Sequence, residues 1–276
     1  MIKIAFYNKK GGVGKTTSVL NIAGELVMRG YKVLVIDTDG QGNSTSQLLI
    51  ENENYKKGSS PTLVDYLEGK VKFNDIIYKA LIKTRSNANA KNKGIDVIAC
   101  DTRIAFTQVD EKKLQNLFHE LEKPYGKHKR QRYDIALVDF SPYMGDNTIS
   151  LFSILNYIVI PVSADCMAQE GMIELKQTLD RIKLNGGNNI NILGVFMNDV
   201  HLTESYDRWI FEDSKEQLKD LMIPTPIRHS TYAKQSVHFG TPLCWLKKTQ
   251  DITKDYAEIT NYLLNKISIS EVKGDK

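Results

Sequence analysis

Residues 10–17 read KGGVGKTT, and this stretch decides the fold of the chain. The apolar segment 2–7 precedes it, and apolar residues at helical spacing follow it from Val19 to Val27. A strand, a glycine-rich loop and a helix in this order are typical of a phosphate-binding loop. Glycines let successive backbone N–H groups turn toward one anion, and the start of the helix adds partial positive charge. The sequence therefore predicts a nucleotide site.

The candidate nucleotide-binding residues of this loop are Lys10, Gly11, Gly12, Val13, Gly14, Lys15, Thr16 and Thr17. Lys15 is placed to reach the terminal phosphates, and the Thr16 hydroxyl is a candidate Mg²⁺ ligand. The strict pattern G-x-x-x-x-G-K-[ST] is not met, because Lys9 occupies its first glycine position. A second lysine, Lys10, stands before the glycines instead. It is either a phosphate-binding cation or a solvated loop residue.

Composition is that of an ordinary globular protein of 276 residues, with 41% hydrophobic and 25% charged residues. No apolar run approaches the ~18 residues of a membrane span. A strand is expected at the very start, so we expect neither a signal peptide nor a preceding DNA-reading domain. Cys100, Cys166 and Cys244 are widely separated, which predicts reduced thiols rather than a metal cluster. The net charge is only +4, so nucleic-acid binding would need a local basic patch.

Apolar, β-branched runs alternate with helical patterns along the chain. We expect strands at 2–7, 32–36, 95–99, 134–138, 157–162 and 190–197, and helices at 62–67, 111–120, 169–182, 205–221 and 252–267. Such alternation predicts one α/β domain over 1–276, with a mostly parallel, twisted sheet covered by helices on both faces. Segments 51–61 and 86–94 have loop composition, and 268–276 reads as a polar tail.

Acidic residues follow two of the expected strands. Asp37 ends the second strand, Asp39 comes two residues later, and Asp139 ends the strand at 134–138. Ligands of open parallel sheets bind beyond the carboxyl ends of the strands, where the phosphate-binding loop also lies. Thr16 and Asp139 are therefore candidate metal residues. Asp37 lies at the same edge, where it could cap a turn or helix after its strand.

Three motifs in order resemble those of the ParA/MinD family of P-loop ATPases. Residues 10–17 resemble its deviant Walker A motif, residues 37–43 (DTDGQGN) its switch I motif D-x-D-P-Q-G-N, and residues 139–145 (DFSPYMG) its D-x-x-P-x-x-G motif. Gly40 stands where proline is usual. The resemblance implies a P-loop fold with ATP and Mg²⁺ as cofactors, and names Lys10, Lys15 and Asp39 as catalytic. Lys10 would reach the partner's phosphates in a homodimer, Asp39 would orient the attacking water, and Asp37 would support the metal shell.

Base recognition is expected at Asn198, since an asparagine at the end of a late strand contacts adenine in this family. The alternative is that Asn198 caps the next helix. The chain lacks the N-K-x-D spacing of guanine readers, which favours ATP over GTP. Residues 225–228 (TPIR) replace the family's T-x-I-P-R, and residues 239–242 (FGTP) follow in place of F-G-x-P.

Residues 161–171 resemble the P-V…E-G segment of ParA proteins, so the resemblance is to a ParA-type partition ATPase. It implies slow hydrolysis stimulated by a ParB-type centromere-binding protein, sequence-independent DNA binding by the ATP-bound dimer, and a cytoplasmic, nucleoid-associated protein. Candidate DNA-binding residues are Arg208, Lys215, Lys219, Arg228, Lys234, Lys247 and Lys248. A second basic set, which could equally be plain solvated surface, is Lys123, Lys127, Lys129, Arg130 and Arg132.

Two other functions remain open. A MinD-like ATPase would bind a membrane through a last helix with a free apolar face, but Asp251, Asp255 and Glu258 lie on that helix. We therefore expect no membrane partner. A nucleotide-gated scaffold or regulator of a non-DNA cargo would need little hydrolysis, which the presence of Asp39 disfavours.

Overall fold

The computed structural model describes residues 1–84, 87–107, 110–126, 130–142, 152, 154–167, 169–185 and 190–267. Within these residues one seven-stranded sheet has the order β3-β4-β2-β5-β1-β6-β7. Its strands are β1 (Ile2–Phe6), β2 (Val33–Asp37), β3 (Ile77–Thr84), β4 (Asn87–Ile98), β5 (Ile135–Asp139), β6 (Tyr157–Val162) and β7 (Asn191–Met197). Neighbouring strands are parallel, except that β3 runs antiparallel to β4 at one edge. The predicted mostly parallel α/β fold is confirmed.

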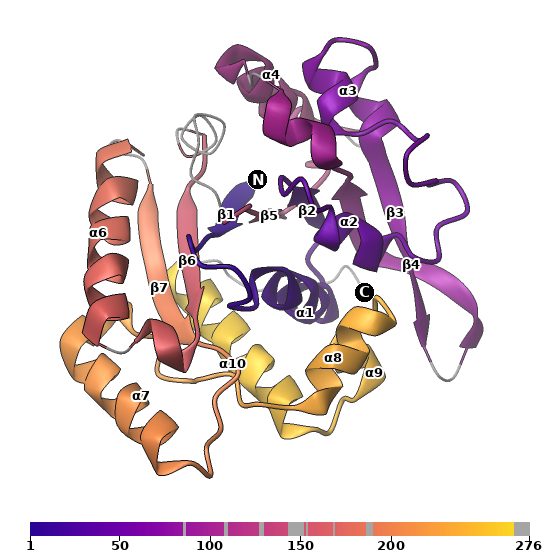
Figure 1. Ribbon diagram of the computed structural model, residues 1–276. Helices are drawn as coiled ribbons and strands as arrows, with labels where there is room; N and C mark the ends of the chain where they lie inside the picture. Colours follow the sequence, from indigo (N-terminus) through magenta and orange to yellow (C-terminus); the bar gives the residue numbers. More distant parts are fainter. Residues whose placement is uncertain are drawn as a thin grey trace.

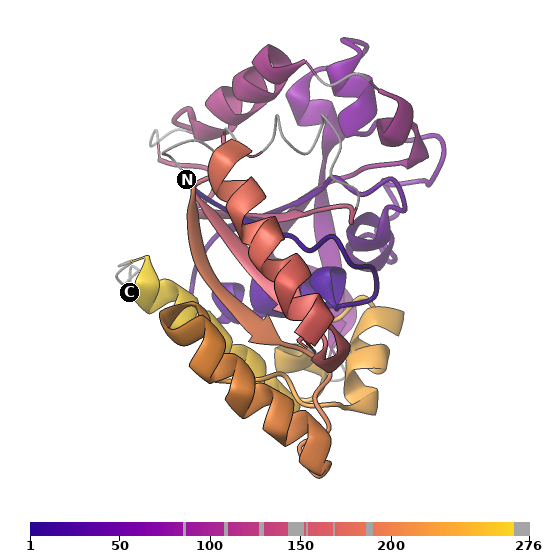
Figure 2. The same ribbon diagram turned by 60° about the vertical axis from the view of Figure 1, so that its left-hand side comes forward.

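Helices cover both faces of this sheet (Figures 1 and 2). One face packs against α1 (Lys15–Met28), α8 (Thr231–His238), α9 (Leu243–Leu246) and α10 (Asp251–Lys266). The other packs against α3 (Leu63–Leu67), α4 (Glu111–Glu122), α6 (Gln169–Asn185) and α7 (Ser205–Leu218). A further helix, α2 (Asn43–Leu48), follows β2, and 3₁₀ turns lie at Phe73–Ile76, Thr102–Phe106, Ala164–Cys166 and Lys219–Leu221.

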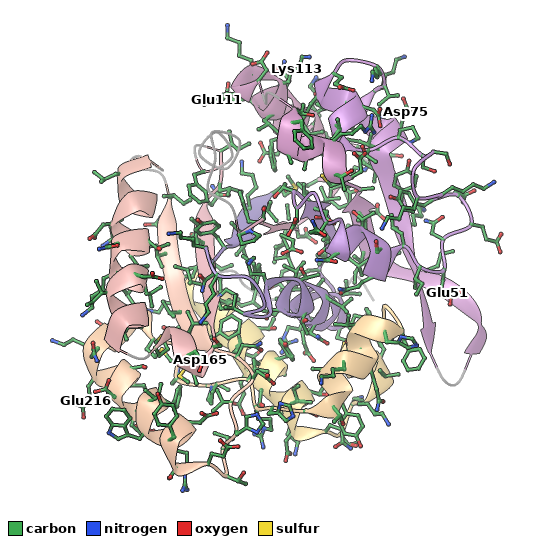
Figure 3. The ribbon with its side chains drawn as sticks, viewed as in Figure 1. Glu51, Asp75, Glu111, Lys113, Asp165 and Glu216 are labelled. Atoms are coloured by element: carbon green, nitrogen blue, oxygen red, sulfur yellow. The ribbon has the colours of Figure 1, made fainter. Side chains whose placement is uncertain are left out.

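Strand β1 shows why these sequences form a two-faced core. Ile4 and Phe6 belong to the cluster under α1 and α10, whereas Ala5 and Tyr7 belong to the cluster on the other face. A strand buried on both faces must be apolar throughout, and β2 and β5 are buried at every residue. Charged side chains such as Asp75, Glu111 and Glu216 stand on the outside of the molecule (Figure 3).

The prediction of a loop over 86–94 is wrong. Residues 87–94 belong to β4, which pairs with β3, a strand that the sequence analysis did not predict. An edge hairpin is held by backbone hydrogen bonds and tolerates polar residues such as Asn and Lys, so its composition is that of a loop. The short helices α2, α8 and α9 were also not predicted. Segment 51–61 is irregular and mostly exposed, as expected, while 268–276 lies outside the described residues.

The strand register brings the carboxyl ends of three strands to one place. Phe6 of β1 and Asp37 of β2 both pair with Asp139 of β5. The loop that follows β1 therefore lies beside both aspartates that end strands. This edge of the sheet carries the site.

Candidate nucleotide-binding site

The glycine-rich loop depends on backbone conformations that favour glycine. Gly12 and Gly14 have φ values of 75° and 88°, and Gly14 precedes the first residue of α1. A Cβ added at Gly14 would lie 2.2 Å from Nδ2 of Asn198, so the amide at the end of β7 packs directly on the loop. The structure thus brings Asn198 to the loop, as the sequence predicts, while Val13 points into the core.

Lys15 is buried and held above this loop. Its Nζ donates to the backbone oxygens of Asn8 and Lys10, both at 3.1 Å. Asn8 fixes the loop from the other side, since its Nδ2 donates to Pro161 O at 2.8 Å and its Oδ1 accepts from Lys10 N at 2.9 Å. These two backbone carbonyls hold the ammonium at the glycine-rich loop, where its positive charge can act on a bound anion.

Asp139 is the centre of the polar cluster behind the loop. Its Oδ2 accepts hydrogen bonds from Thr16 Oγ1 and Ser44 Oγ, each at 2.7 Å. Its Oδ1 is buried and has no hydrogen-bond partner among the described residues. An unpaired buried carboxylate oxygen is costly, and oxygen ligands are what Mg²⁺ prefers. The Thr16 hydroxyl and this oxygen fit a magnesium ion that keeps several of its waters.

Asp37 lies one layer deeper. Its Oδ2 accepts from the backbone N and the Oγ1 of Thr45, both at 2.8 Å, and its Oδ1 accepts from Asp39 N at 3.0 Å. Both oxygens are thus occupied in ordering the segment between β2 and α2. These hydrogen bonds correspond to the alternative role of Asp37 as a cap, and its role in the metal shell stays a prediction.

Burial and a neighbouring carboxylate raise the pKa of each of the two aspartates that end strands. Burial first, and then the Asp139 charge, raise the pKa of Asp37 to about 7. Burial also raises the pKa of Asp139 to about 6, although the hydroxyls of Thr16 and Ser44 oppose the shift. Such clustered, perturbed carboxyls are typical of sites that receive a cation.

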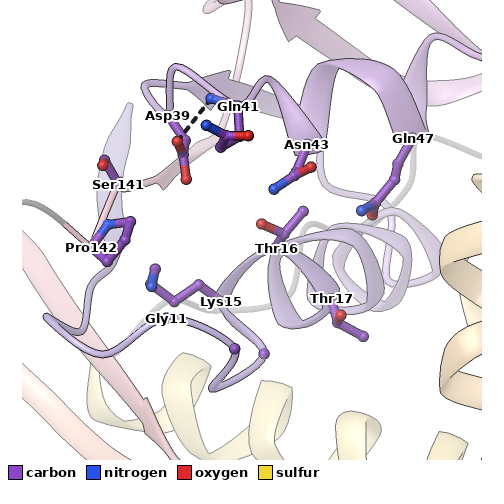
Figure 4. A pocket seen from close by; sticks show the side chains of 12 residues that line it. Gly11, Lys15, Thr16, Thr17, Asp39, Gln41, Asn43, Gln47, Ser141 and Pro142 are labelled. Carbon is purple, nitrogen blue, oxygen red and sulfur yellow. Dashed lines mark hydrogen bonds between the residues drawn. The ribbon is translucent and has the colours of Figure 1, made fainter. Parts of the chain in front are cut away.

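A pocket of about 540 Å³ opens over this cluster (Figure 4). Its wall is formed by Gly11, Gly12, Gly14, Lys15, Thr16, Thr17, Asp39, Gln41, Asn43, Gln47, Ser141 and Pro142. Asp39 faces Lys15 across the opening, and its Oδ1 accepts from Gln41 N at 2.9 Å. Lys10 is not part of the wall: its side chain is exposed and makes no hydrogen bond or ion pair with a described residue.

Several residues of this site were missed in the sequence. Ser44 and Gln47 lie on α2 and were not singled out, because a short polar helix leaves no periodic signal. Asn8 follows β1 directly and could have been noticed from its position before the loop. The contact of Ser44 with Asp139 spans 95 residues, and no local pattern predicts it.

The predicted DNA-binding residues lie on separate elements. Arg208 and Lys215 are on α7, Lys219 follows it, Lys234 is on α8, and Lys247 and Lys248 follow α9. Arg228 is bound internally: its Nε and Nη2 donate to the two oxygens of buried Asp255 at 2.7 and 2.8 Å. In the second set, Lys123 pairs with Glu120, Arg132 donates to Asn74, and Lys127 and Lys129 lie outside the described residues.

The chain is similar to a family model and to two proteins over most of its length. The AAA domain family model matches residues 1–192. The sporulation initiation inhibitor protein Soj of Bacillus subtilis is 27% identical over 240 residues, which cover 87% of this chain and 89% of Soj. The chromosome partitioning protein ParA of Caulobacter vibrioides is 25% identical over 241 residues, or 87% of this chain and 85% of that protein.

Solved structures share the fold over nearly the whole chain. A putative plasmid partition protein from Borrelia burgdorferi bound to AMPPNP has a TM-score of 0.73 and 23% identity, covering 96% of this chain and 99% of that one. Cobyrinic acid a,c-diamide synthase from Mycobacterium smegmatis, bound to an ATP analog and magnesium, has a TM-score of 0.74 and 18% identity, with coverages of 96% and 94%. With the loop, the switch aspartates and these matches together, the chain belongs to the AAA domain family and, within it, to the ParA-type ATPases of the ParA/MinD family.

Proposed function

We propose that this chain is a Mg²⁺-dependent ATPase of the partition type. In this proposal its ATP-bound homodimer binds DNA without sequence preference, and a ParB-type partner releases it by stimulating slow hydrolysis. The observation that carries the proposal is the hydrogen bond of 2.7 Å from Thr16 Oγ1 to Asp139 Oδ2. Thr16 lines the same pocket as the buried Lys15 and Asp39. Phosphates bound on the loop would lie close to the Lys15 ammonium, to the metal site at Thr16 and Asp139, and to the Asp39 carboxylate.

The residues of the site have distinct tasks. Thr16 Oγ1 and Asp139 Oδ1 would hold Mg²⁺, which supplies positive charge to the phosphate oxygens when it is bound. Lys15 and the loop amides bind the same phosphates, and Asn198 beside Gly14 is available to the adenine edge. Asp39 keeps one oxygen on Gln41 N, so its other oxygen can orient the attacking water.

Support for the dimer comes from Lys10. The Lys10 side chain is exposed and makes no hydrogen bond or ion pair with a described residue, so its ammonium could reach a phosphate bound by a second copy. Two subunits that face each other through these loops would each lend one cation to the other's triphosphate. Charge placed where it develops in the transition state is the largest single contribution to many enzymatic rates.

DNA binding is proposed for the face that carries α8 and α9. Lys234 and Lys248 are exposed there, and Lys247 lies with its Nζ 4.6 Å from the Tyr232 ring centroid. Arg208, Lys215 and Lys219 lie on or just after α7, which also carries four acidic residues. The names of the relatives, which include a chromosome partitioning protein, support a cytoplasmic protein associated with the nucleoid.

The membrane alternative loses its main support in the structure. Ile252, Tyr256, Ile259 and Leu263, the apolar stripe of α10, are buried in the core rather than free for a lipid surface. Among the described residues no helix is long and apolar enough to cross a bilayer.

A binding experiment across a salt series tests the proposed function. The protein is incubated with unrelated duplex DNAs in ADP, ATP or AMPPNP, with liposomes of anionic lipid in a parallel arm. We expect binding to every duplex with ATP and AMPPNP, lost steeply as salt rises, and none with ADP. Binding that ignores the nucleotide, or that occurs only on liposomes, would refute the partition assignment.

A further inference from the structure

The outer face of α7 is unusual for an exposed helix. Trp209 is 62% exposed and Tyr206 is 53% exposed, and their ring centroids lie 6.3 Å apart. The buried side of the same helix is formed by Asp207, Ile210, Phe211, Ser214 and Leu218. The two rings therefore lie on the side that faces away from the sheet, where they gain nothing from the core.

Two carboxylates continue the line of these rings. Tyr206, Trp209, Asp213 and Glu216 follow one another at spacings of three, four and three residues, so they form one stripe along the helix. We call these four residues the α7 stripe. Figure 3 shows Glu216 on the outside of α7, pointing away from the molecule.

Among the described residues, no ion pair neutralises the negative charge of the α7 stripe. Glu216 makes no ion pair or hydrogen bond with a described residue, and Asp213 accepts a hydrogen bond only from Gln217 Nε2, at 2.7 Å, in that part of the chain. Glu212, just beside the stripe, is instead paired with Lys215 at 2.6 Å. Unpaired acids on a protein whose net charge is +4 are open to a cationic partner.

We infer that the α7 stripe is the docking surface for an arginine-rich helical segment of a partner protein. One guanidinium would stack on Trp209, and two further cations would pair with Asp213 and Glu216, one turn apart. Arginine fits better than lysine, because its planar group both stacks on an aromatic ring and binds carboxylates in a fork. DNA is disfavoured, since its phosphates would meet these acids.

The identification of this partner with the protein that stimulates hydrolysis rests on the proposed function. The docking surface itself does not, because it is remote in sequence from the loop and can be tested without nucleotide. A result that refutes the proposed function would therefore not refute the docking surface, and a result that refutes the docking surface would not refute the proposed function.

The test uses the fluorescence of Trp209 in the full chain. The chain has two tryptophans, and Trp245→Phe removes the other signal. The probe is an alanine-based helical peptide with three arginines at the spacing of Trp209, Asp213 and Glu216. We expect a saturable change of Trp209 emission, and weaker binding of the same peptide with lysine in place of arginine.

Variants decide whether the α7 stripe is responsible. Replacing both acids, D213N together with E216Q, should weaken the arginine peptide about tenfold, which is the loss of two exposed ion pairs. The matched control E212Q changes the paired neighbour and should leave affinity within about twofold. Thermal unfolding of each variant shows whether it is folded. Equal affinity of the double variant and the parent, or a Trp209 response to duplex DNA but not to the peptide, would overturn the inference.

Discussion

Asp255 is predicted to be a strong determinant of stability in the carboxyl-terminal part of the chain. Its side chain is 5% exposed, and it accepts three hydrogen bonds from Arg228, at 3.1 Å from the backbone N, 2.7 Å from Nε and 2.8 Å from Nη2. These contacts join α10 to the segment that leads into α8. In Asp255→Ala the backbone N–H of Arg228 loses its acceptor, and the guanidinium keeps only its longer contact with exposed Asp251 among the described residues.

The magnitude follows from this geometry. Hydrogen bonds to a charged group contribute about 1.5–3 kcal/mol each, and removal of one partner leaves the other desolvated. The Arg228 side chain is 36% exposed, so water recovers part of this loss. We expect a decrease of about 3 kcal/mol in the free energy of unfolding, well below the sum of three full contributions.

Urea unfolding monitored by fluorescence measures this change directly. The matched control is Asp251→Ala on the same helix, whose side chain is 57% exposed and lies 3.3 Å from Arg228 Nη1. This variant should lose much less stability than Asp255→Ala, because exposed ion pairs contribute little. Equal losses in the two variants, or a loss below about 1 kcal/mol in Asp255→Ala, would show that Arg228 is not anchored in this way.

Three further predictions concern the site and its surroundings. Asp39→Ala should bind ATP normally but hydrolyse it about 10²-fold more slowly in a single-turnover assay, and unchanged turnover would remove Asp39 from the mechanism. Gly240→Ala should lower the free energy of unfolding by about 3 kcal/mol, because the φ of Gly240 is 56° and the new Cβ would lie 1.9 Å from a backbone oxygen of α2. The control is Gly58→Ala, where φ is 83° but no atom lies within 4 Å of the new Cβ. It should lose only about 1 kcal/mol in the same urea assay. In the nucleotide-free protein the pKa values of Asp37 and Asp139 are raised to about 7 and about 6, so their protonated forms are the ones that the fold favours. Their contribution to stability is therefore present at acidic pH and is lost as the pH rises through those values. Mg²⁺ binds the carboxylates, so calorimetry should show tighter Mg·ADP binding at about pH 8 than at about pH 5.5, with proton release between them, whereas equal affinity would contradict the assignment.

The sequence was most informative where the determinants are local. The strand, glycine loop and helix over residues 2–28 are encoded within one continuous stretch, and the structure agrees with that prediction. Asp37 and Asp139 were also identified, because an aspartate at the end of an apolar strand has a position fixed by the parallel sheet.

Long-range contacts could not be predicted in this way. The hairpin of β3 and β4 is polar near its turn, and only its pairing with β2 shows that the segment is part of the sheet. The sequence suggested that Arg228 is an exposed cation available to DNA. In the structure it binds Asp255, which is 27 residues away, and so joins two parts of the chain. Composition reports how many charges a segment has and not which of them are already paired.

The role proposed above for Lys10 has a consequence for the order in which nucleotide binds and subunits associate. Its backbone oxygen restrains the Lys15 ammonium, while its own side chain is left outside. A phosphate that attracts the Lys15 ammonium competes with the Lys10 backbone oxygen for it. We therefore expect the segment around residue 10 to become less restrained when its own subunit binds nucleotide. In a subunit without nucleotide the Lys10 ammonium would then reach the partner's phosphate less readily. We therefore expect the dimer to form only after both subunits have bound nucleotide. Relaxation measurements that found residue 10 equally rigid with and without nucleotide would contradict this timing.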